Sequence, residues 1–243
     1  MRAVEFVVQE WNAWAPGIDS HKAWQNWLGH QTFDNSVKSV SPTLVSKQLM
    51  RRLSPLGRAV FKAAETFSER GKALPIVFSS AHGEVNKSLE MLKNMQKADE
   101  VSPTAFSLSV HNAIAGLFSI ANINHQEITV LAPGQDGIAP AFLEALGLLQ
   151  EHHKEVLMIL YDEPLSDFYP SLPFALNAPA ICALVLKISL TGNGLPLSFC
   201  RSVATREDGE HALQIFALLK FLVSGDKVLE LGNHRHSCEW RKI

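Results

Sequence analysis

Cysteine is scarce in this sequence, and long hydrophobic runs are absent. The three cysteines, Cys182, Cys200 and Cys238, are widely separated and form no Cys-x-x-Cys pair. An odd number of thiols at such spacings indicates neither a disulfide framework nor a zinc site, so we expect a reducing, cytoplasmic compartment. No apolar run approaches the ~20 residues that a membrane-spanning helix requires, and no membrane span is expected.

The sequence also lacks an excess of charge of either sign. Its 243 residues hold 24 acidic and 22 strongly basic side chains, which gives a formal net charge of −2. Nucleic-acid-binding proteins usually carry a basic excess or stripe, so a nucleic-acid partner is not expected. With 47% hydrophobic residues the chain can bury a sizeable core, and no linker-like composition divides it. We therefore expect a single domain over residues 1–243.

Common catalytic and nucleotide-binding motifs are missing as well. The sequence has no Gly-x-Ser-x-Gly, no Gly-x-Gly-x-x-Gly and no Walker lysine, so it lacks the signatures of α/β-hydrolases and of nucleotide-binding folds. The pair Asp162-Glu163 is interpreted as a solvated strand end. His234 and His236 stand near Cys238 at a spacing that does not suit a zinc knuckle. We expect no metal and no cofactor.

Five apolar runs, rich in Val, Ile and Leu, predict buried strands at residues 6–8, 76–79, 128–132, 156–161 and 181–190. Most are continuous, which is typical of strands buried on both faces of a parallel or mixed sheet. Apolar residues recur at helical spacing over 58–70, 84–97 and 135–151, which predicts helices between the strands. The alternation indicates an α/β fold.

Three further segments receive predictions. The N-terminal run carries charges and has no cleavage site, so it is predicted as a strand and not as a signal peptide. The proline-rich stretch 164–179 predicts a loop. Residues 227–243 predict a final edge strand.

The most informative segment is a sharp turn between a strand and a helix. Residues 128–132 lead through a Pro-Gly pair into an amphipathic helix that begins at residues 135–137. Such an elbow holds one side chain at a helix N-terminus, where the dipole favours a thiolate or an oxyanion. The residue there is a glutamine, whose amide neither attacks nor titrates. We assign the elbow to Pro133, Gly134, Gln135 and Gly137.

Spacings around Gln135 carry a resemblance to a known family. Ala141 and Ala145 stand six and ten residues after Gln135. Upstream, the segment Asn112-Ala-Ile-Ala115-Gly116 follows a Ser-Pro pair, with its asparagine 23 residues before Gln135. The sequence thereby resembles the N-terminal domain of the β-ketoacyl synthases of the thiolase superfamily, whose nucleophilic cysteine would stand at position 135. The resemblance, surest over residues 1–205, implies a thiolase-like half: a mixed five-stranded sheet with helices on both faces.

Two departures from the family pattern bear on function. Glutamine replaces the nucleophilic cysteine, as in the chain length factors, the inactive halves of type II polyketide ketosynthase heterodimers. The sequence also lacks the His-Gly-Thr and Lys-x-x-Gly-His motifs that family members carry in a second half. Without a thiol and these histidines, a ketosynthase can neither form the acyl thioester nor decarboxylate and condense a malonyl thioester. The resemblance therefore implies a subunit that is inert alone.

The resemblance also implies partners. As in aryl-polyene and type II polyketide systems, the chain would form a heterodimer with a full-length β-ketoacyl synthase. It would shape the acyl or polyene tunnel of that partner while an acyl carrier protein presents the growing chain. The strand before the elbow would pair across the dimer axis by β-augmentation, and the segment 102–116 would be inserted at the tunnel. The residues implied at this interface are Thr104, Ala105, Phe106, Ser109, Asn112, Gly116, Glu127, Ile128, Thr129, Val130, Leu131 and Ala132.

Helical spacing leaves one point of this interface open. Phe106, Val110, Ile114 and Leu117 follow one another at intervals of four, four and three residues, which is also ordinary core spacing. Phe106 can face either the partner or the core, whereas the other three are predicted as core. A half-domain is further expected to expose the large apolar face that its second half would cover.

Two other functions stay open at this point. One is a stand-alone thiolase-like acyltransferase or hydrolase that uses Cys182, Cys200 or a histidine near the end of the chain. The other is a homodimeric scaffold that docks the carrier protein. A reactive thiol would favour the first, and a homodimer indifferent to any ketosynthase would favour the second.

Overall fold

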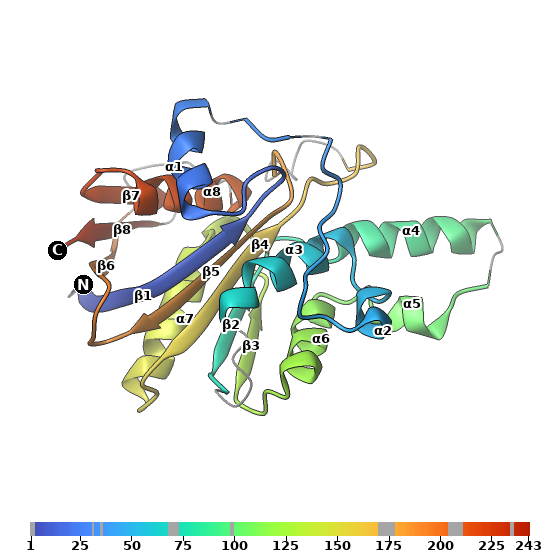
Figure 1. The fold of residues 1–243 in the computed structure, drawn as a ribbon, viewed down its shortest axis with the longest axis horizontal. Helices are drawn as coiled ribbons and strands as arrows, with labels where there is room; N and C mark the ends of the chain where they lie inside the picture. Colours follow the sequence, from blue (N-terminus) through green and yellow to red (C-terminus); the bar gives the residue numbers. More distant parts are fainter. Residues whose placement is uncertain are drawn as a thin grey trace.

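An eight-stranded sheet forms the centre of the structure, a computed structural model that describes residues 3–30, 32–34, 36–67, 73–97, 100–169, 178–203, 211–233 and 236–243 (Figure 1). The strands are ordered β3-β2-β4-β5-β1-β6-β8-β7, so β3 and β7 are its edges. Their bounds are β1 Val4–Trp14, β2 Ile76–Ser79, β3 Ile128–Leu131, β4 Val156–Asp162, β5 Cys182–Ser189, β6 Leu195–Val203, β7 Val228–Gly232 and β8 His236–Lys242.

The five predicted strands lie next to one another in this sheet, from β3 to β1. β2 runs parallel to β3 and to β4, whereas β5 is antiparallel to β4 and to β1. The predicted mixed sheet is therefore present, and the N-terminal run is a strand as expected. Continuous apolar runs indicated these strands because a central strand such as β4 is buried along its whole length.

The predicted number of five strands is wrong, because β6, β8 and β7 extend the sheet beyond β1. β6 alternates buried residues such as Leu197 and Phe199 with polar ones, so it has no continuous apolar run. The last strand is also not at the edge. β8 lies between β6 and β7, since residues 228–232 form a strand that pairs with it.

Helices cover both faces of the sheet, as expected. α3 (Pro55–Ala63) and α6 (Ala113–Asn122) pack against one face, where Ile76 and Phe78 of β2 lie, and the short α2 (Lys47–Met50) lies beside them. The other face, on which Val77 of β2 lies, is covered by three helices: α1 (His21–His30), α7 (Ala139–Gln150) and α8 (His211–Val223). The result is three layers with the sheet in the middle.

The bounds of two predicted helices need correction. α4 (Val85–Gln96) matches the predicted helix. α3 begins earlier than predicted because the Ser54 hydroxyl accepts a hydrogen bond from the N–H of Gly57 and caps it. It ends at Ala63 and is followed by the 3-10 turn η1 (Glu65–Phe67), while residues 68–72 lie outside the described part. The third helix is divided into the 3-10 turn η2 (Gly134–Asp136) and α7, because Gly137 has a φ of +65°.

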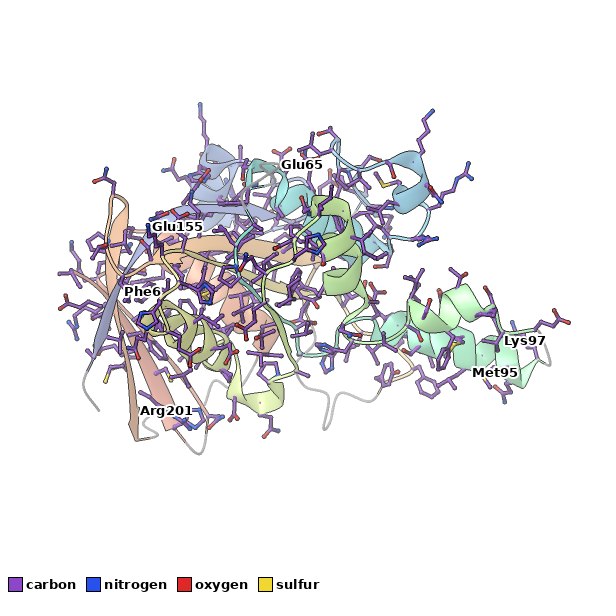
Figure 2. All side chains as sticks on the ribbon, turned by 90° about the horizontal axis from the view of Figure 1, so that it is seen from below. Phe6, Glu65, Met95, Lys97, Glu155 and Arg201 are labelled. Carbon is purple, nitrogen blue, oxygen red and sulfur yellow. The ribbon has the colours of Figure 1, made fainter. Side chains whose placement is uncertain are left out.

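α4 and α5 (Pro103–Ser107) form an arm that projects from the body of the molecule in both views (Figures 1 and 2). Met95 and Lys97 lie near its tip (Figure 2). α5 has no buried residue, and in α4 only Leu89 is buried. The arm therefore has little apolar packing of its own.

The C-terminal strands cover α7. The ring of Phe142 on this helix lies 5.9 Å from those of Phe6 and Phe199 and 5.2 Å from that of Trp240, centroid to centroid. Within α7, Leu143 is the one large apolar side chain that is exposed. The large uncovered face expected of a half-domain is therefore absent from this helix, because the strands β6 and β8 occupy that side.

The stretch predicted as a loop has neither helix nor strand in its described residues, 164–169 and 178–179, while residues 170–177 lie outside the described part. Within the described residues, no helix is both long enough and apolar enough to cross a lipid bilayer.

Candidate functional site

A sharp turn with two glycines follows β3. Gly134, the first residue of the turn η2, and Gly137, which follows the turn, have positive φ angles of +57° and +65°. Gln135 lies in this turn with its side chain exposed, and it makes no side-chain hydrogen bond to another described residue. A free amide therefore stands where the resemblance puts the nucleophile of a ketosynthase.

A side chain of α8 caps the N-terminus of α7 from the buried side. Neither η2 nor α7 has a side-chain cap from its own N-cap residue. Instead Gln214, only 4% exposed, accepts a hydrogen bond through Oε1 from the backbone N–H of Ile138 at 3.0 Å. A Cβ at position 137 would overlap this oxygen, so the site requires glycine for space as well as for its φ. An N–H group that could otherwise bind an anion at this helix end is thus already paired.

A second set of polar contacts holds the other side of the elbow. Asn233, buried between β7 and β8, donates through Nδ2 to the carbonyl of Gln135 and to the carboxylate of Asp136, both at 2.9 Å. His236 Nε2 lies 3.8 Å from the same carboxylate, and Arg201 donates to His236 Nδ1 at 2.8 Å. Of the two histidines that the sequence singled out near Cys238, His236 therefore lies beside the elbow, whereas His234 lies outside the described residues.

β3 is an edge strand whose outer side pairs with no described strand. The carbonyls of Glu127 and Leu131 accept hydrogen bonds from Ile76 and Ser80 on the β2 side. Because successive residues of a strand present their backbone groups to opposite sides, Ile128 and Val130 present theirs to the open side. The hydroxyl of Thr129 is held by the Glu144 carboxylate of α7 at 2.8 Å. β3 ends at Leu131, one residue before the predicted strand, and the exposed Ala132 lies outside it.

α6 packs over β3 and carries an exposed stripe. Its buried side includes Ile114 and Leu117, so these two residues belong to the core as predicted. On the opposite side, Ile120 and Ile123 are 73% and 70% exposed. A Cβ at Gly116, one turn earlier, would meet nothing within 4 Å. The exposed Asn112 begins this stripe. We call the outer edge of β3 together with Gly116, Ile120 and Ile123 the β3–α6 surface; α6 lies next to β3, an edge strand of the sheet (Figure 1).

The arm adds further exposed apolar side chains. Phe106, which the sequence left open, is 59% exposed. Val110 is also exposed, so its prediction as core is wrong; the arm holds it away from the sheet. Thr104 is exposed, while Ala105 and Ser109 are half-buried. The carbonyl of Ser109 accepts a hydrogen bond from the Ser88 hydroxyl at 2.8 Å, which fastens the residues after α5 to α4.

Buried carboxyl groups lie at the ends of β2 and β4, where the sequence predicted a solvated strand end. That prediction is wrong for Asp162, which is 2% exposed. Its carboxylate accepts hydrogen bonds from the hydroxyl of Ser80 at 2.8 Å and from the N–H of Ala81 at 3.0 Å. Burial raises the pKa of Glu163 to about 7, although a hydrogen bond from Asn86 opposes the shift. The contacts of Asp162 hold the turn after β2 against the end of β4.

Two of the three cysteines, Cys182 and Cys238, are buried and offer no reactive thiolate. Complete burial raises the pKa of the Cys182 thiol far above its usual range, and burial raises that of Cys238 to about 11. Such thiols stay protonated at neutral pH. Among the described residues, no group of three or more His, Cys, Asp or Glu side chains is placed to hold a metal ion.

Comparison with known proteins identifies the fold. The family model for the N-terminal domain of β-ketoacyl synthases matches residues 24–241. No curated protein matches the sequence. A similar solved structure is a ketosynthase (ApeO) in complex with its chain length factor (ApeC) from Xenorhabdus doucetiae, with a TM-score of 0.84 and 23% identity over 98% of this chain and 100% of that chain.

Two more distant structures have the same fold. The ishigamide ketosynthase/chain length factor matches with a TM-score of 0.68 and 10% identity over 98% of this chain and 99% of that chain. The AntDE:AntF complex of a type II acyl carrier protein with its ketosynthase matches with a TM-score of 0.65 and 11% identity over 100% of both chains. The thiolase-like ketosynthase fold that the resemblance implies is thereby confirmed. Since the family model spans most of its length, the chain belongs to the β-ketoacyl synthase N-terminal domain family.

Proposed function

We propose that this chain is a non-catalytic, chain-length-factor-like subunit of a ketosynthase heterodimer. It pairs with a full-length β-ketoacyl synthase and shapes the tunnel in which that partner elongates a carrier-protein-bound acyl or polyene chain, as in aryl-polyene synthesis. Residues 1–243 act as a single ketosynthase-like domain. The three cysteines are free, which fits the reducing cytoplasm expected from the sequence.

The observation that carries this proposal is the β3–α6 surface. An unpaired strand edge beside exposed Ile120 and Ile123 offers main-chain hydrogen bonds and apolar area in one place. Two of the similar structures contain a ketosynthase and a chain length factor. A partner of the same fold brings a matching strand and helix, so the two sheets join around a pseudo-twofold axis.

The arm supplies the part that reaches the tunnel. Phe106 is a large apolar side chain with no core position, and α5 presents it beside Thr104 and Ala105. Contact with an apolar acyl tunnel would remove this side chain from water, which favours association. In this arrangement the bulk of Phe106 limits the length of the chain that the tunnel accepts.

The elbow supports the absence of intrinsic catalysis. Gln135 provides no nucleophile, and Gln214 already binds the Ile138 N–H of the helix end. The buried, protonated Cys182 and Cys238 offer no replacement. Condensation is therefore assigned to the partner, which contributes the cysteine and the histidines.

Co-expression with a full-length ketosynthase from the same genome neighbourhood tests this function. Size-exclusion chromatography with mass determination should give a stable one-to-one complex, and elongation from a malonyl carrier protein should require both chains. Ile120→Asp should abolish the complex, whereas Leu190→Asp, at an exposed turn after β5, should leave it intact.

Two outcomes would contradict the proposal. A ketosynthase that elongates equally well without this chain would exclude the subunit role. A stable homodimer of this chain that ignores the ketosynthase but binds carrier protein would favour the scaffold instead.

A further inference from the structure

Two buried amides that the sequence did not single out converge on the elbow. Gln214 on α8 and Asn233 before β8 are each 4% exposed. Gln214 accepts from the N–H of Ile138, and Asn233 donates to the carbonyl of Gln135. Buried amides are retained in a core where partners satisfy them. Here the partners are backbone groups on both sides of the exposed Gln135.

We infer that Gln214 and Asn233 are positioning residues, which hold the backbone of the elbow around Gln135 in one conformation after the interface strand β3. We call these two contacts the clamp. This inference rests on the proposed function and deepens it: it places the side chain of Gln135 at the tunnel of the heterodimer, and the two buried amides act through the Gln135 backbone.

The backbone of the elbow requires such support. It passes through positive φ at Gly134, where the single 3-10 turn η2 begins, and again at Gly137, directly after that turn. Glycine leaves this conformation open to many alternatives, and a sparsely populated backbone persists where surrounding contacts over-determine it. Gln135 stands four residues after the last residue of β3, so it lies within about 14 Å of that strand end.

A third anchor comes from Asp136. Its carboxylate accepts from Asn233 Nδ2 at 2.9 Å and lies 3.8 Å from His236 Nε2, and His236 is in turn held by Arg201. All of these anchors belong to residues 201–236, the part of the chain that extends the sheet beyond β1. The C-terminal segment thus covers α7 and also fixes the elbow.

A glutamine with a fixed backbone projects its side chain from a constant point. The exposed amide of Gln135 carries two N–H donors and one carbonyl acceptor, which suit a polar group such as a keto oxygen of the growing chain. A mobile backbone would move these groups and lose the selectivity. The clamp therefore bears on which product the heterodimer makes.

A backbone measurement on the isolated chain tests the clamp itself. Gln214→Met removes the acceptor at nearly constant size, and Gln214→Glu keeps an acceptor oxygen in either protonation state. Hydrogen–deuterium exchange should accelerate at least tenfold at the Ile138 amide in Gln214→Met, with β4 amides unchanged, and Gln214→Glu should restore protection. If Gln214→Met does not fold, Asn233→Ala removes the bond to the Gln135 carbonyl, and faster exchange is then expected at the Asp136 amide, which closes the turn by its bond to Pro133.

A product measurement on the complex with the ketosynthase and its malonyl carrier protein tests the link to Gln135. Gln214→Met should change the distribution of product lengths in the same direction as Gln135→Ala, and the double variant should match Gln135→Ala alone. Unchanged exchange at Ile138 in Gln214→Met would overturn the clamp, and additive effects in the double variant would overturn its action through Gln135. A wild-type chain that forms no complex would instead refute the proposed function, which separates the two failures.

Discussion

At the scale of single residues, buried polar groups link distant segments of the chain in a way that the sequence did not indicate. Asp162 follows an apolar strand and is adjacent to another acid, a pattern that resembles a solvated strand end. In the structure its carboxylate accepts hydrogen bonds from the Ser80 hydroxyl and the Ala81 N–H, which lie 82 and 81 residues earlier in the chain. A single sequence contains no signal for such a pairing, because the partners are set by the β2–β4 register.

Asp162→Ala should destabilise the fold by about 3 kcal/mol, because it leaves a buried hydroxyl and a buried N–H without their acceptor. Urea unfolding checks this value. Glu151→Ala, which removes an exposed carboxylate at the end of α7, is the matched control and should change stability by less than ~0.5 kcal/mol. Equal effects of the two substitutions would contradict the role given to Asp162.

Glu163 predicts a pH dependence of stability. Its pKa is raised from an ordinary value of 4.5 to about 7, chiefly by burial and also by the neighbouring carboxylates of Glu84, Asp162 and Glu90. The folded state therefore holds this proton more tightly than the unfolded state does. The stabilisation is complete below pH ~4.5 and is lost as the pH rises through about 7.

Glu163→Gln keeps an acceptor for Asn86 and cannot ionise. Urea midpoints measured from pH 5 to pH 8 should fall less steeply for this variant than for the wild type, and the variant should be the more stable protein at pH 8. A wild-type slope that the substitution leaves unchanged would show that Glu163 is not responsible.

At the scale of elements, apolar pattern located the first five strands. It predicted β2, β4 and β5 well, because these strands are buried almost throughout, but it predicted only residues 6–8 of β1, which spans Val4–Trp14. It missed β6 and β7, where buried and polar residues alternate or where the run is short. It also placed Gln135 correctly at a strand–helix turn but not the contacts of Gln214 and Asn233, since those depend on how the C-terminal strands return to the elbow.

The edge strand β3 gives an element-scale prediction. Val130→Pro removes an N–H that faces the open side and spares the bonds to β2 made through Glu127 and Leu131. The variant chain should fold, as judged by circular dichroism, yet its affinity for the ketosynthase should fall at least a hundredfold in a titration. Retained affinity would exclude pairing through β3.

The arm gives a second prediction at the scale of elements. Phe106→Ala removes an exposed side chain and should leave the stability of the chain within ~0.5 kcal/mol of wild type. In the heterodimer it should lengthen the products, because the tunnel would lose the bulk that limits it. Mass spectrometry of the products measures this, with Leu92→Ala on the outer part of the arm as the control. Products of unchanged length would assign Phe106 to binding alone.

At the scale of the whole molecule, the C-terminal segment changes what a ketosynthase-like domain exposes. On the side of α7 that faces the sheet, Phe199 of β6 and Trp240 of β8 pack against Phe142, so this helix carries no large bare face. Exposed apolar side chains include Ile120 and Ile123 at the end of α6 and Phe106 on the arm. Both β3 and β7 are edge strands of the described sheet. We place association at β3 because its open edge lies beside the exposed Ile120 and Ile123.

Hydrogen–deuterium exchange of this chain, free and bound to its ketosynthase, tests the central claim most directly. Pairing through the edge strand predicts strong new protection of the Ile128 and Val130 amides, whose N–H groups face the open side of β3. The amides of Ile76 and Ser80, already bonded to Glu127 and Leu131, should change little. A complex that protects other segments and leaves Ile128 and Val130 exchanging as in the free chain would contradict the account.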